Sequence, residues 1–490
     1  MKKILFLLSA LVLFGCTAKE SLSPVLTIEG GQVQGVPSDI KGVTVFRGIP
    51  YAAAPIGDLR WKEPQPVTPW KGVKVCDTYG HPSFQSVHYP GGYTTEWGYG
   101  KEQAYSEDCL YANVWTKAPG NPNAKLPVAL WIHGGGYREG WSSEPEFEGA
   151  EWGAKDVVLV SINYRLGVFG FLTHPDLAAE SPHGVSGNYG ILDQIQAMKW
   201  IKANIAPFGG DPDNVTIFGQ SAGAGSVKTL VASPLTKGLF NRAIIMSGGG
   251  LNPVVSSAAE VPPSMARFPR LTPEEQAAKN KEIFEWAGYD SLEKMRRAGT
   301  IEVAALATIY QGATGQFASF TGSPVIDGYV STKSFDQACI DGSLADVPYM
   351  MGYTMNDMGN MASGIAAFCL NREEKGGKAG AYEFARPLPD DGSEPTVTAR
   401  LKGAFHSSDL WYVFKTLKYC WRPWAQGDWD LSEKILTAWT NFAKYGDPNG
   451  KDGGAWAPCT KDNQKFMVFK LDKDDKEASE LTDPVTELGY

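Results

Sequence analysis

Short apolar runs alternate with segments of helical periodicity through the middle of the chain. Four runs are typical of buried strands, at residues 126–135, 156–165, 214–219 and 242–249. Between the second and third, Ile191, Ile195, Met198, Ile201 and Ile205 recur at helical spacing, which predicts an amphipathic helix over 191–206. This order predicts an α/β fold with a large, mostly parallel sheet and helices on both faces. In such sheets, sites form beyond the carboxyl ends of the strands.

The pattern changes after residue 250. Residues 251–271 are rich in Pro and Ser, and a helical segment then begins at Thr272, with Pro273 at its first position and Glu275 completing a capping box. We expect residues 251–348 to form a helical excursion over the sheet and the active site. Residues 16–490 are therefore predicted to form one domain.

The first fifteen residues are predicted to be an export signal. Lys2 and Lys3 precede an apolar run that is too short to span a bilayer. The run ends with Gly15 before Cys16, which resembles a bacterial lipobox, so Cys16 is the expected lipid attachment site. This predicts a lipoprotein of the bacterial cell envelope, in the periplasm or at the cell surface. The alternative is a plain signal peptide cut near Ala18.

Charge and cysteine spacing exclude two classes of site. The formal net charge of the 490-residue chain is -9, and no basic block is present, which disfavours a nucleic-acid partner. The cysteines beyond Cys16 follow no metal-ligand spacing, so no zinc site is expected. Whether Cys339, Cys369, Cys420 and Cys459 form disulfides is left open, as is the oligomeric state.

Ser221 lies in the motif Gly-x-Ser-x-Gly, between a predicted strand and a predicted helix. The motif alone also occurs in loops without chemistry, but its small residues permit a sharp turn that projects a nucleophilic hydroxyl. A serine hydroxyl needs a base and an acid to activate it. The chain order in sheet hydrolases is Ser, acid, His, and His406 is the one histidine after Ser221.

A second motif supplies donors for an oxyanion. The glycine run at 134–136 follows a predicted buried strand, so the backbone N–H groups of Gly135 and Gly136 are unobstructed. Ala222 follows the serine and offers a third donor from the first turn of its helix, where amides are unpaired. The alternative is a flexible loop, which the position of both motifs at strand ends disfavours.

These residues resemble the type B carboxylesterase family, which includes the cholinesterases, within the α/β-hydrolase fold. The segments "FRGIPYAAAPIGDLRW", "SEDCLYANVWT", "GNYGILDQIQAMKWIKANIAPFGGDPDNVTIFGQSAG" and "NFAKYGDPNG" are similar to family patterns in the expected order, across nearly the whole mature chain. The resemblance implies that Ser221 is the nucleophile and that His406 is the general base and then the acid. It also implies that Gly135, Gly136 and Ala222 form the oxyanion hole.

The resemblance places the triad acid at Asp357, five residues beyond Gly352, where most members carry Glu. Only 49 residues separate it from His406, whereas many relatives have a much longer segment there. Asp409 and Asp327 are the rival carboxylates.

Two further departures concern the surroundings of the site. Gln220 stands where many relatives carry Glu before the nucleophile, which removes an attraction for cationic choline esters. Ser83 stands where relatives often hold a cysteine that pairs with the one in "SEDC". Cys76 lies nearby, so a Cys76–Cys109 disulfide is expected, with two free thiols as the alternative.

The segment 77–108 between these two cysteines carries five aromatic residues among glycines: Tyr89, Tyr93, Trp97, Tyr99 and Tyr105. Aromatic side chains at a site entrance can stack on a sugar or an aromatic acyl group, and Tyr93 and Trp97 are the candidate substrate-binding residues. The alternative is that these residues only pack a long surface loop.

The sequence therefore predicts a serine esterase that hydrolyses carboxylic esters through an acyl-enzyme, with acyl or feruloyl esters of carbohydrates as the hypothesised substrates. No metal or organic cofactor is implied, because the base and the oxyanion donors supply what acyl transfer needs. The expected partner is a small-molecule or oligosaccharide ester, with membrane contact only through the lipid anchor. The alternative functions are an inactive cholinesterase-like binding protein and a serine peptidase.

Overall fold

The computed structural model of the chain describes residues 22–86, 92–97, 104–252, 271–359, 361–392 and 401–483. The predicted export signal 1–15, the predicted lipid attachment site Cys16, and Tyr89 and Tyr99 lie outside the described residues.

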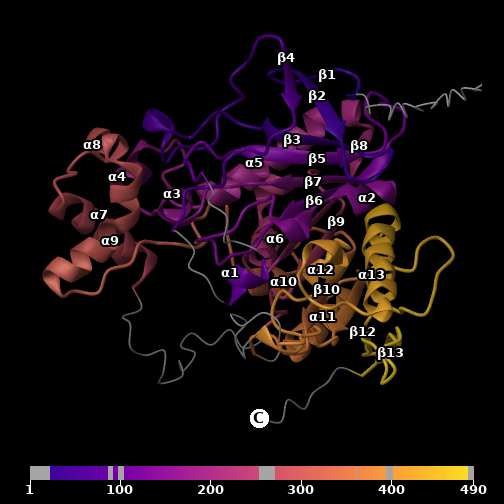
Figure 1. The fold of residues 1–490 in the computed structure, drawn as a ribbon. Helices are drawn as coiled ribbons and strands as arrows, with labels where there is room; N and C mark the ends of the chain where they lie inside the picture. The colour runs from indigo at the N-terminus through magenta and orange to yellow at the C-terminus, as the bar shows by residue number, and fades with distance from the viewer. Residues whose placement is uncertain are drawn as a thin grey trace, which may run out of the picture.

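A single large twisted sheet runs through the molecule (Figure 1). Its strands are β1 (Leu26–Ile28), β2 (Gly31–Pro37), β3 (Thr44–Pro50), β4 (Val73–Cys76), β5 (Tyr111–Thr116), β6 (Leu126–Ile132), β7 (Val158–Ile162), β8 (Gly210–Gln220), β9 (Arg242–Met246), β10 (Tyr349–Thr354), β11 (Ala379–Phe384), β12 (Phe466–Phe469) and β13 (Glu480–Thr482). The order across the sheet is β1-β2-β3-β5-β7-β6-β8-β9-β10-β11-β12-β13, and β4 pairs with β2. Neighbours from β7 to β12 are parallel, and the pairs toward both edges, other than β2 with β4, are antiparallel.

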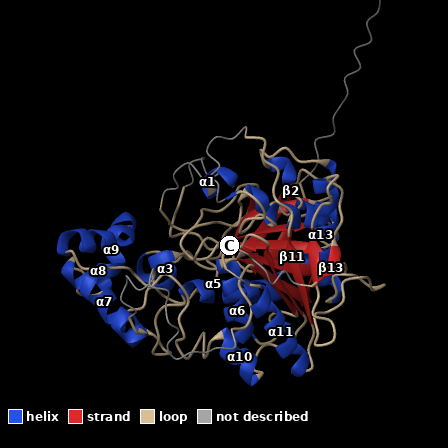
Figure 2. Cartoon of the chain, turned by 90° about the horizontal axis from the view of Figure 1, so that it is seen from below, coloured by secondary structure: helices blue, strands red, loops and turns tan. Residues whose placement is uncertain are grey.

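Helices cover both faces of the sheet (Figure 2). They are α1 (Tyr93–Glu96), α2 (Ala150–Ala154), α3 (Gly167–Phe171), α4 (Pro175–Glu180), α5 (Tyr189–Asn204), α6 (Ala222–Ala232), α7 (Pro273–Trp286), α8 (Leu292–Arg297), α9 (Thr300–Thr314), α10 (Phe335–Asp341), α11 (Ala362–Glu374), α12 (Leu410–Val413) and α13 (Gln426–Tyr445). The four predicted central strands are β6 to β9, and the predicted helix 191–206 is α5, so the expected α/β architecture is confirmed.

The central strands are apolar throughout because both of their faces are buried. In β6, Val128, Leu130 and Ile132 belong to the hydrophobic core that contains α5 and α6. The alternate residues Ala129 and Trp131 belong to the core on the other face, with residues of α2, α12 and α13. Successive side chains of a strand point to opposite faces, so one continuous apolar run feeds two cores.

The segment after β9 is helical, as expected, and its position adds detail. The capping box at the start of α7 is present: the Thr272 hydroxyl accepts from the Glu275 N–H, and the Glu275 carboxylate accepts from the Thr272 N–H. Helices α7, α8 and α9 form a cluster at one side of the sheet, where α7 contacts α4 and α9 contacts α3 (Figures 1 and 2). Helix α9 and the loop that follows it line a pocket beside the site described below.

The predicted Cys76–Cys109 disulfide is wrong, because both residues are free thiols. Cys76 ends β4, where pairing with Gly35 of β2 fixes its backbone near the edge of the sheet. Cys109 is fully buried, and its thiol interacts with the Ser83 hydroxyl. Burial raises the pKa of the Cys76 thiol to about 11. The remaining described cysteines are also free thiols: Cys339, Cys369, Cys420 and Cys459.

Candidate active site

Ser221 occupies a strained turn between β8 and α6. Its φ of 57° and ψ of -121° lie in a region that residues other than glycine seldom adopt. A Cβ on Gly223 would lie 2.0 Å from the Ile132 carbonyl oxygen of β6, and a Cβ on Gly219 would lie 2.5 Å from the Gly223 carbonyl carbon. Glycine at both positions therefore lets the turn pack against β6, and the turn places Ser221 at the carboxyl end of β8.

The glycine loop after β6 faces the same turn. Gly135 and Gly136 have φ of 94° and 61°, and a Cβ on Gly135 would lie 2.0 Å from the Glu139 carbonyl oxygen. Both glycines line one pocket of about 400 Å³ together with Ser221. Ala222 begins α6, so its N–H belongs to the first turn of the helix. Two of the three predicted oxyanion donors thus line the pocket of Ser221, and the third, Ala222, follows Ser221 in the chain.

Asp357 and His406 are joined by a short hydrogen bond. The imidazole Nδ1 of His406 donates to Oδ1 of Asp357 at 2.6 Å. Asp357 lies three residues beyond β10, and its loop is pinned to the loop of His406 because the Asn356 N–H donates to the Ala404 carbonyl at 2.9 Å. A 49-residue separation in sequence is therefore closed by backbone pairing at the end of a strand.

The electrostatics of this pair favour an ionised Asp357. Burial raises the pKa of the Asp357 carboxyl, but the hydrogen bond and the charge of His406, with a smaller contribution from the Met358 N–H, bring the pKa below its ordinary value. The Thr354 hydroxyl also donates to Oδ2 at 3.1 Å. His406 is only 8% exposed, so its ring is held inside the protein and not in solvent.

The second ring nitrogen of His406 lies against Gln220. The Gln220 side-chain amide Nε2 is 3.2 Å from Nε2 of His406, which fits an amide donating to the unprotonated ring nitrogen. Across the part of the chain that the structure describes, no hydrogen bond joins the Ser221 hydroxyl to His406. Both side chains line the same 400 Å³ pocket. Hydrogen bonds of this kind are often long in unliganded sites and tighten when substrate binds.

The rival carboxylates are engaged elsewhere. Asp409 is buried and accepts from the Tyr382 hydroxyl at 3.4 Å, and its pKa is raised to about 7 by burial and then by the charge of Asp357. Asp327 accepts from the backbone N–H groups of Tyr329 and Ser331, at 3.0 Å each. Of the three candidate acids, all within the described residues, Asp357 is the one that hydrogen-bonds the imidazole.

Tyr93 and Trp97 both line the pocket, but in different ways. The Tyr93 hydroxyl donates to the His406 carbonyl at 3.2 Å, and its ring stacks on Trp97 with centroids 6.1 Å apart. Trp97 is 5% exposed and packs against Trp411, with centroids 5.5 Å apart. Trp97 is therefore mainly a packing residue, while Tyr93 contacts the backbone of His406. Tyr105 packs on Trp141.

Charged residues of the pocket wall were not singled out from the sequence. Arg138, Glu139, Glu144 and Glu146 line the pocket beside the glycine loop. Glu146 is fully buried and lies against the Glu144 carboxyl. Burial and then the charge of Glu144 raise its pKa well above the ordinary value. In the sequence these residues stand out only as an acidic stretch after the glycine loop. Such a stretch usually lies on a solvated surface, so it does not indicate a pocket wall.

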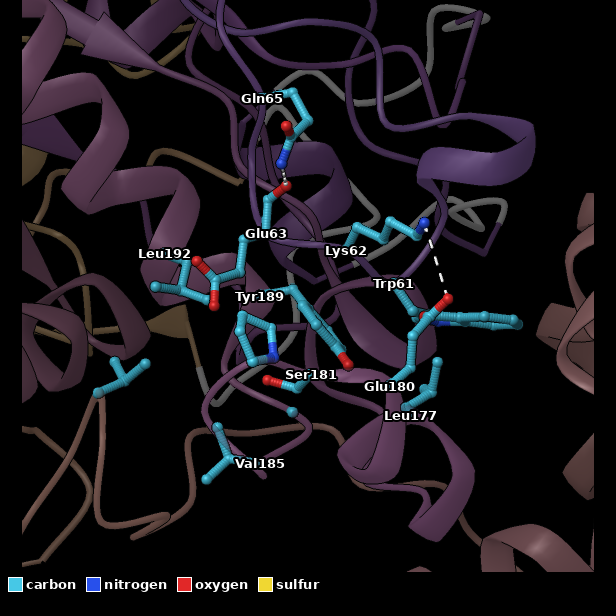
Figure 3. Close-up of a pocket in the computed structure, with 13 residues that line it drawn as sticks. Trp61, Lys62, Glu63, Gln65, Leu177, Glu180, Ser181, Val185, Tyr189 and Leu192 are labelled. Carbon is cyan, nitrogen blue, oxygen red and sulfur yellow. Dashed lines mark hydrogen bonds and ion pairs between the residues drawn. The ribbon is translucent and has the colours of Figure 1, made fainter.

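A separate pocket of about 260 Å³ lies away from these residues (Figure 3). Trp61, Tyr189 and Leu177 contribute to its wall, and Lys62 pairs with Glu180 at its rim at 3.7 Å. Neither the triad candidates nor the oxyanion donors line it. Ser221, His406, Gly135 and Gly136 line the 400 Å³ pocket and not this one.

Comparison with known proteins fits this geometry. The model of the carboxylesterase family matches residues 22–374 and 360–484. The chain belongs to the carboxylesterase family. It is 35% identical to a fumonisin B1 esterase of Sphingopyxis macrogoltabida over 382 residues, which span 76% of this chain and 65% of that relative. It is 30% identical to carboxylesterase 1F of Mus musculus over 531 residues, which span 92% of this chain and 91% of that relative.

Solved esterases share the fold. A PNB esterase superposes with a TM-score of 0.72 at 26% identity, covering 93% of this chain and 97% of that chain. A carboxylesterase of Geobacillus stearothermophilus superposes with a TM-score of 0.72 at 27% identity and the same coverage. By family and by these relatives, this member of the carboxylesterase family is a carboxylic ester hydrolase with the α/β-hydrolase fold.

The described residues contain neither a metal centre nor a membrane-spanning helix. No group of three or more His, Cys, Asp and Glu side chains is placed there to hold a metal ion. No helix in those segments has both the length and the apolar character of a membrane span.

Proposed function

We propose that this esterase works through an acyl-enzyme on Ser221, with His406 as the base and Asp357 as the acid of a catalytic triad. The observation that carries the proposal is the 2.6 Å hydrogen bond between His406 and Asp357, in the pocket into which the strained turn projects Ser221. A buried carboxylate at Nδ1 holds the imidazole with its other nitrogen free to accept a proton.

The reaction proceeds in two halves. Ser221 attacks the ester carbonyl carbon while His406 Nε2 takes the hydroxyl proton, and the carbonyl oxygen becomes an oxyanion. The N–H groups of Gly135, Gly136 and Ala222 stabilise that oxyanion. Collapse of the intermediate breaks the bond to the alcohol, which leaves with the proton from His406. Water, deprotonated by His406, then attacks the acyl-serine and releases the acid.

Gln220 occupies the ring nitrogen of His406 that must take the proton when Ser221 attacks the ester. Its amide lies 3.2 Å from the ring nitrogen that must accept the serine proton. Substrate binding is therefore expected to move the Ser221 hydroxyl or the imidazole so that the hydroxyl replaces the amide at Nε2. Displacing the neutral Gln220 amide from Nε2 takes less free energy than displacing a carboxylate would, because a carboxylate would form an ion pair with a protonated imidazole.

Covalent labelling tests the nucleophile and separates an enzyme from an inactive cholinesterase-like binding protein. An organophosphonate is expected to label the wild-type protein once, at Ser221 by peptide mass spectrometry. Ser221→Ala and His406→Ala should lose labelling and at least about 10³-fold in kcat, because triad members act as a unit. The exposed Ser343→Ala variant is the matched control and should keep both. Unchanged labelling of Ser221→Ala would refute the proposal.

The substrate proposal is an acyl or feruloyl ester of a carbohydrate. Its support is Tyr93, an aromatic side chain that lines the pocket and can stack on a sugar or an aromatic acid. The test compares acetylated-sugar, feruloyl and 4-nitrophenyl esters, together with fumonisin B1, the compound in the name of the Sphingopyxis relative. Tyr93→Ala should lower kcat/KM on the sugar esters more than Tyr93→Phe does. Equal values for both variants and the wild type would end this proposal.

We further propose export as a lipoprotein attached through Cys16, with residues 16–490 as the single mature domain. The support is the sequence of the first sixteen residues. Radioactive palmitate should label the full chain in a bacterial host, and Cys16→Ala should abolish the label. Labelling that persists in Cys16→Ala, or a soluble wild-type protein cut near Ala18, would contradict the lipid anchor.

A further inference from the structure

A neighbouring pocket of about 230 Å³ adjoins the active-site pocket through one shared residue, Arg138. Its walls come from residues 84–86, from residues 166–169 at the start of α3, from α9, and from the loop 318–322 that follows α9. Arg138 is three residues from Gly135, and its N–H donates to the Gly135 carbonyl at 3.0 Å. This bond holds the backbone of Arg138 on the glycine loop, to which the proposed function assigns the ester carbonyl.

Among the described residues that line this neighbouring pocket, Arg138 is the one that carries a charge. The Arg138 guanidinium lies beside the loop after α9: a Cβ built on Gly322 of that loop would be 3.4 Å from the Nε of Arg138. The residue is exposed, and within the described residues it has no ion pair or hydrogen bond from its side chain. Glu139, Glu144 and Glu146 line the active-site pocket but not this one. The positive charge is thus left without a counter-charge in the neighbouring pocket.

We propose that the neighbouring pocket binds a free carboxylate of the ester substrate through Arg138, so that the enzyme prefers esters carrying a second, unesterified acid group. This inference rests on the proposed function, since it places the reacting carbonyl at Ser221. A guanidinium offers several N–H donors in a planar fork that matches a carboxylate. The other polar side chains of the wall, Gln85, Ser86, Thr308, Ser319 and Thr321, are uncharged and do not repel an anion.

The test compares matched esters that differ only in the charge of one end. With the carboxylate on the acyl side, the pair is mono-4-nitrophenyl glutarate and 4-nitrophenyl pentanoate. With the carboxylate on the alcohol side, the pair is 5-acetoxypentanoate and pentyl acetate, followed by pH-stat. The readout is the ratio of kcat/KM for the anionic ester to that for the neutral ester, so general effects on turnover cancel.

Arg138→Gln should lower this ratio about tenfold or more in one of the two pairs, which identifies the side of the ester that enters the pocket. Arg138→Lys keeps the charge and should retain more of the ratio than Arg138→Gln. Arg297→Gln removes an exposed cation on α8 and is the matched charge control, with an unchanged ratio. High salt should lower the wild-type ratio, because the contact is exposed. A ratio unchanged by Arg138→Gln in both pairs would overturn the inference.

A binding measurement separates this inference from the proposed function. In the Ser221→Ala background, calorimetry with mono-4-nitrophenyl glutarate and with 5-acetoxypentanoate should show binding that Arg138→Gln weakens about tenfold for one of the two esters. Equal affinity of both esters with and without Arg138→Gln would refute the carboxylate subsite whatever the catalytic mechanism. If the wild-type protein turned over none of the four esters, the proposed function would fail, while this binding result would still decide the subsite.

Discussion

Asp357→Asn is the sharpest test of the proposed triad. The substitution keeps the shape of the side chain but removes the negative charge that faces His406 Nδ1 at 2.6 Å. The Asp357 side chain is 1% exposed, so solvent screens the pair little. Two unit charges about 4 Å apart attract by about 4 kcal/mol at an effective dielectric constant of about 20. Since that attraction exists only once the imidazole is protonated in the transition state, kcat should fall about 10³-fold.

The assay is kcat on 4-nitrophenyl butyrate at neutral pH, with circular dichroism and thermal unfolding to show that the variants fold. Asp409→Asn is the matched control, because Asp409 is an equally buried carboxylate near the pair that does not hydrogen-bond the imidazole. It should change kcat less than about tenfold. If Asp357→Asn kept more than a tenth of the wild-type kcat, or if Asp409→Asn lost as much, Asp357 would not be the acid of the triad.

Three further predictions concern stability and the cysteines. In the folded protein the pKa of Asp409 is about 7, whereas an unperturbed aspartate has a pKa of 3.8. Between about pH 4 and 7 the folded protein therefore keeps a proton on Asp409 that the unfolded chain has released. As pH rises through this range, Asp409 lowers the free energy of unfolding. In urea unfolding, Asp409→Asn should therefore be more stable than wild type at pH 8 by up to about 4 kcal/mol and not at pH 4, and a pH-independent difference would contradict this. Gly223→Ala should lower the free energy of unfolding by about 1–3 kcal/mol or more in thermal or urea unfolding, because the new Cβ would overlap the Ile132 carbonyl oxygen. A variant as stable as the wild type would contradict the close packing of this turn against β6. Protein purified and unfolded without reductant should take up iodoacetamide at both Cys76 and Cys109, whereas protection of both would restore the disulfide.

Local features of the chain were predictable from the sequence because each depends on neighbouring residues. Apolar runs that feed two cores predicted β6 to β9, and the capping box predicted the start of α7 at Pro273. The small residues around Ser221 predicted the strained turn, because the close approach to β6 leaves no room for a Cβ at Gly219 or Gly223. Chain order then left His406 as the candidate base.

Other features were decided by contacts between distant segments. Asp357 rather than Asp409 meets the imidazole because the loops after β10 and before α12 pair through Asn356, which no local pattern encodes. The disulfide prediction failed because the partners of each cysteine are set by tertiary packing: β4 pairs Cys76 with Gly35 of β2, and Cys109 lies buried against Ser83. The charged wall that contains Arg138 and Glu146 depends on the fold, which brings these residues into one pocket with Ser221 and His406. Sequence thus determined the elements and the reactive serine, and tertiary packing determined which charges surround it.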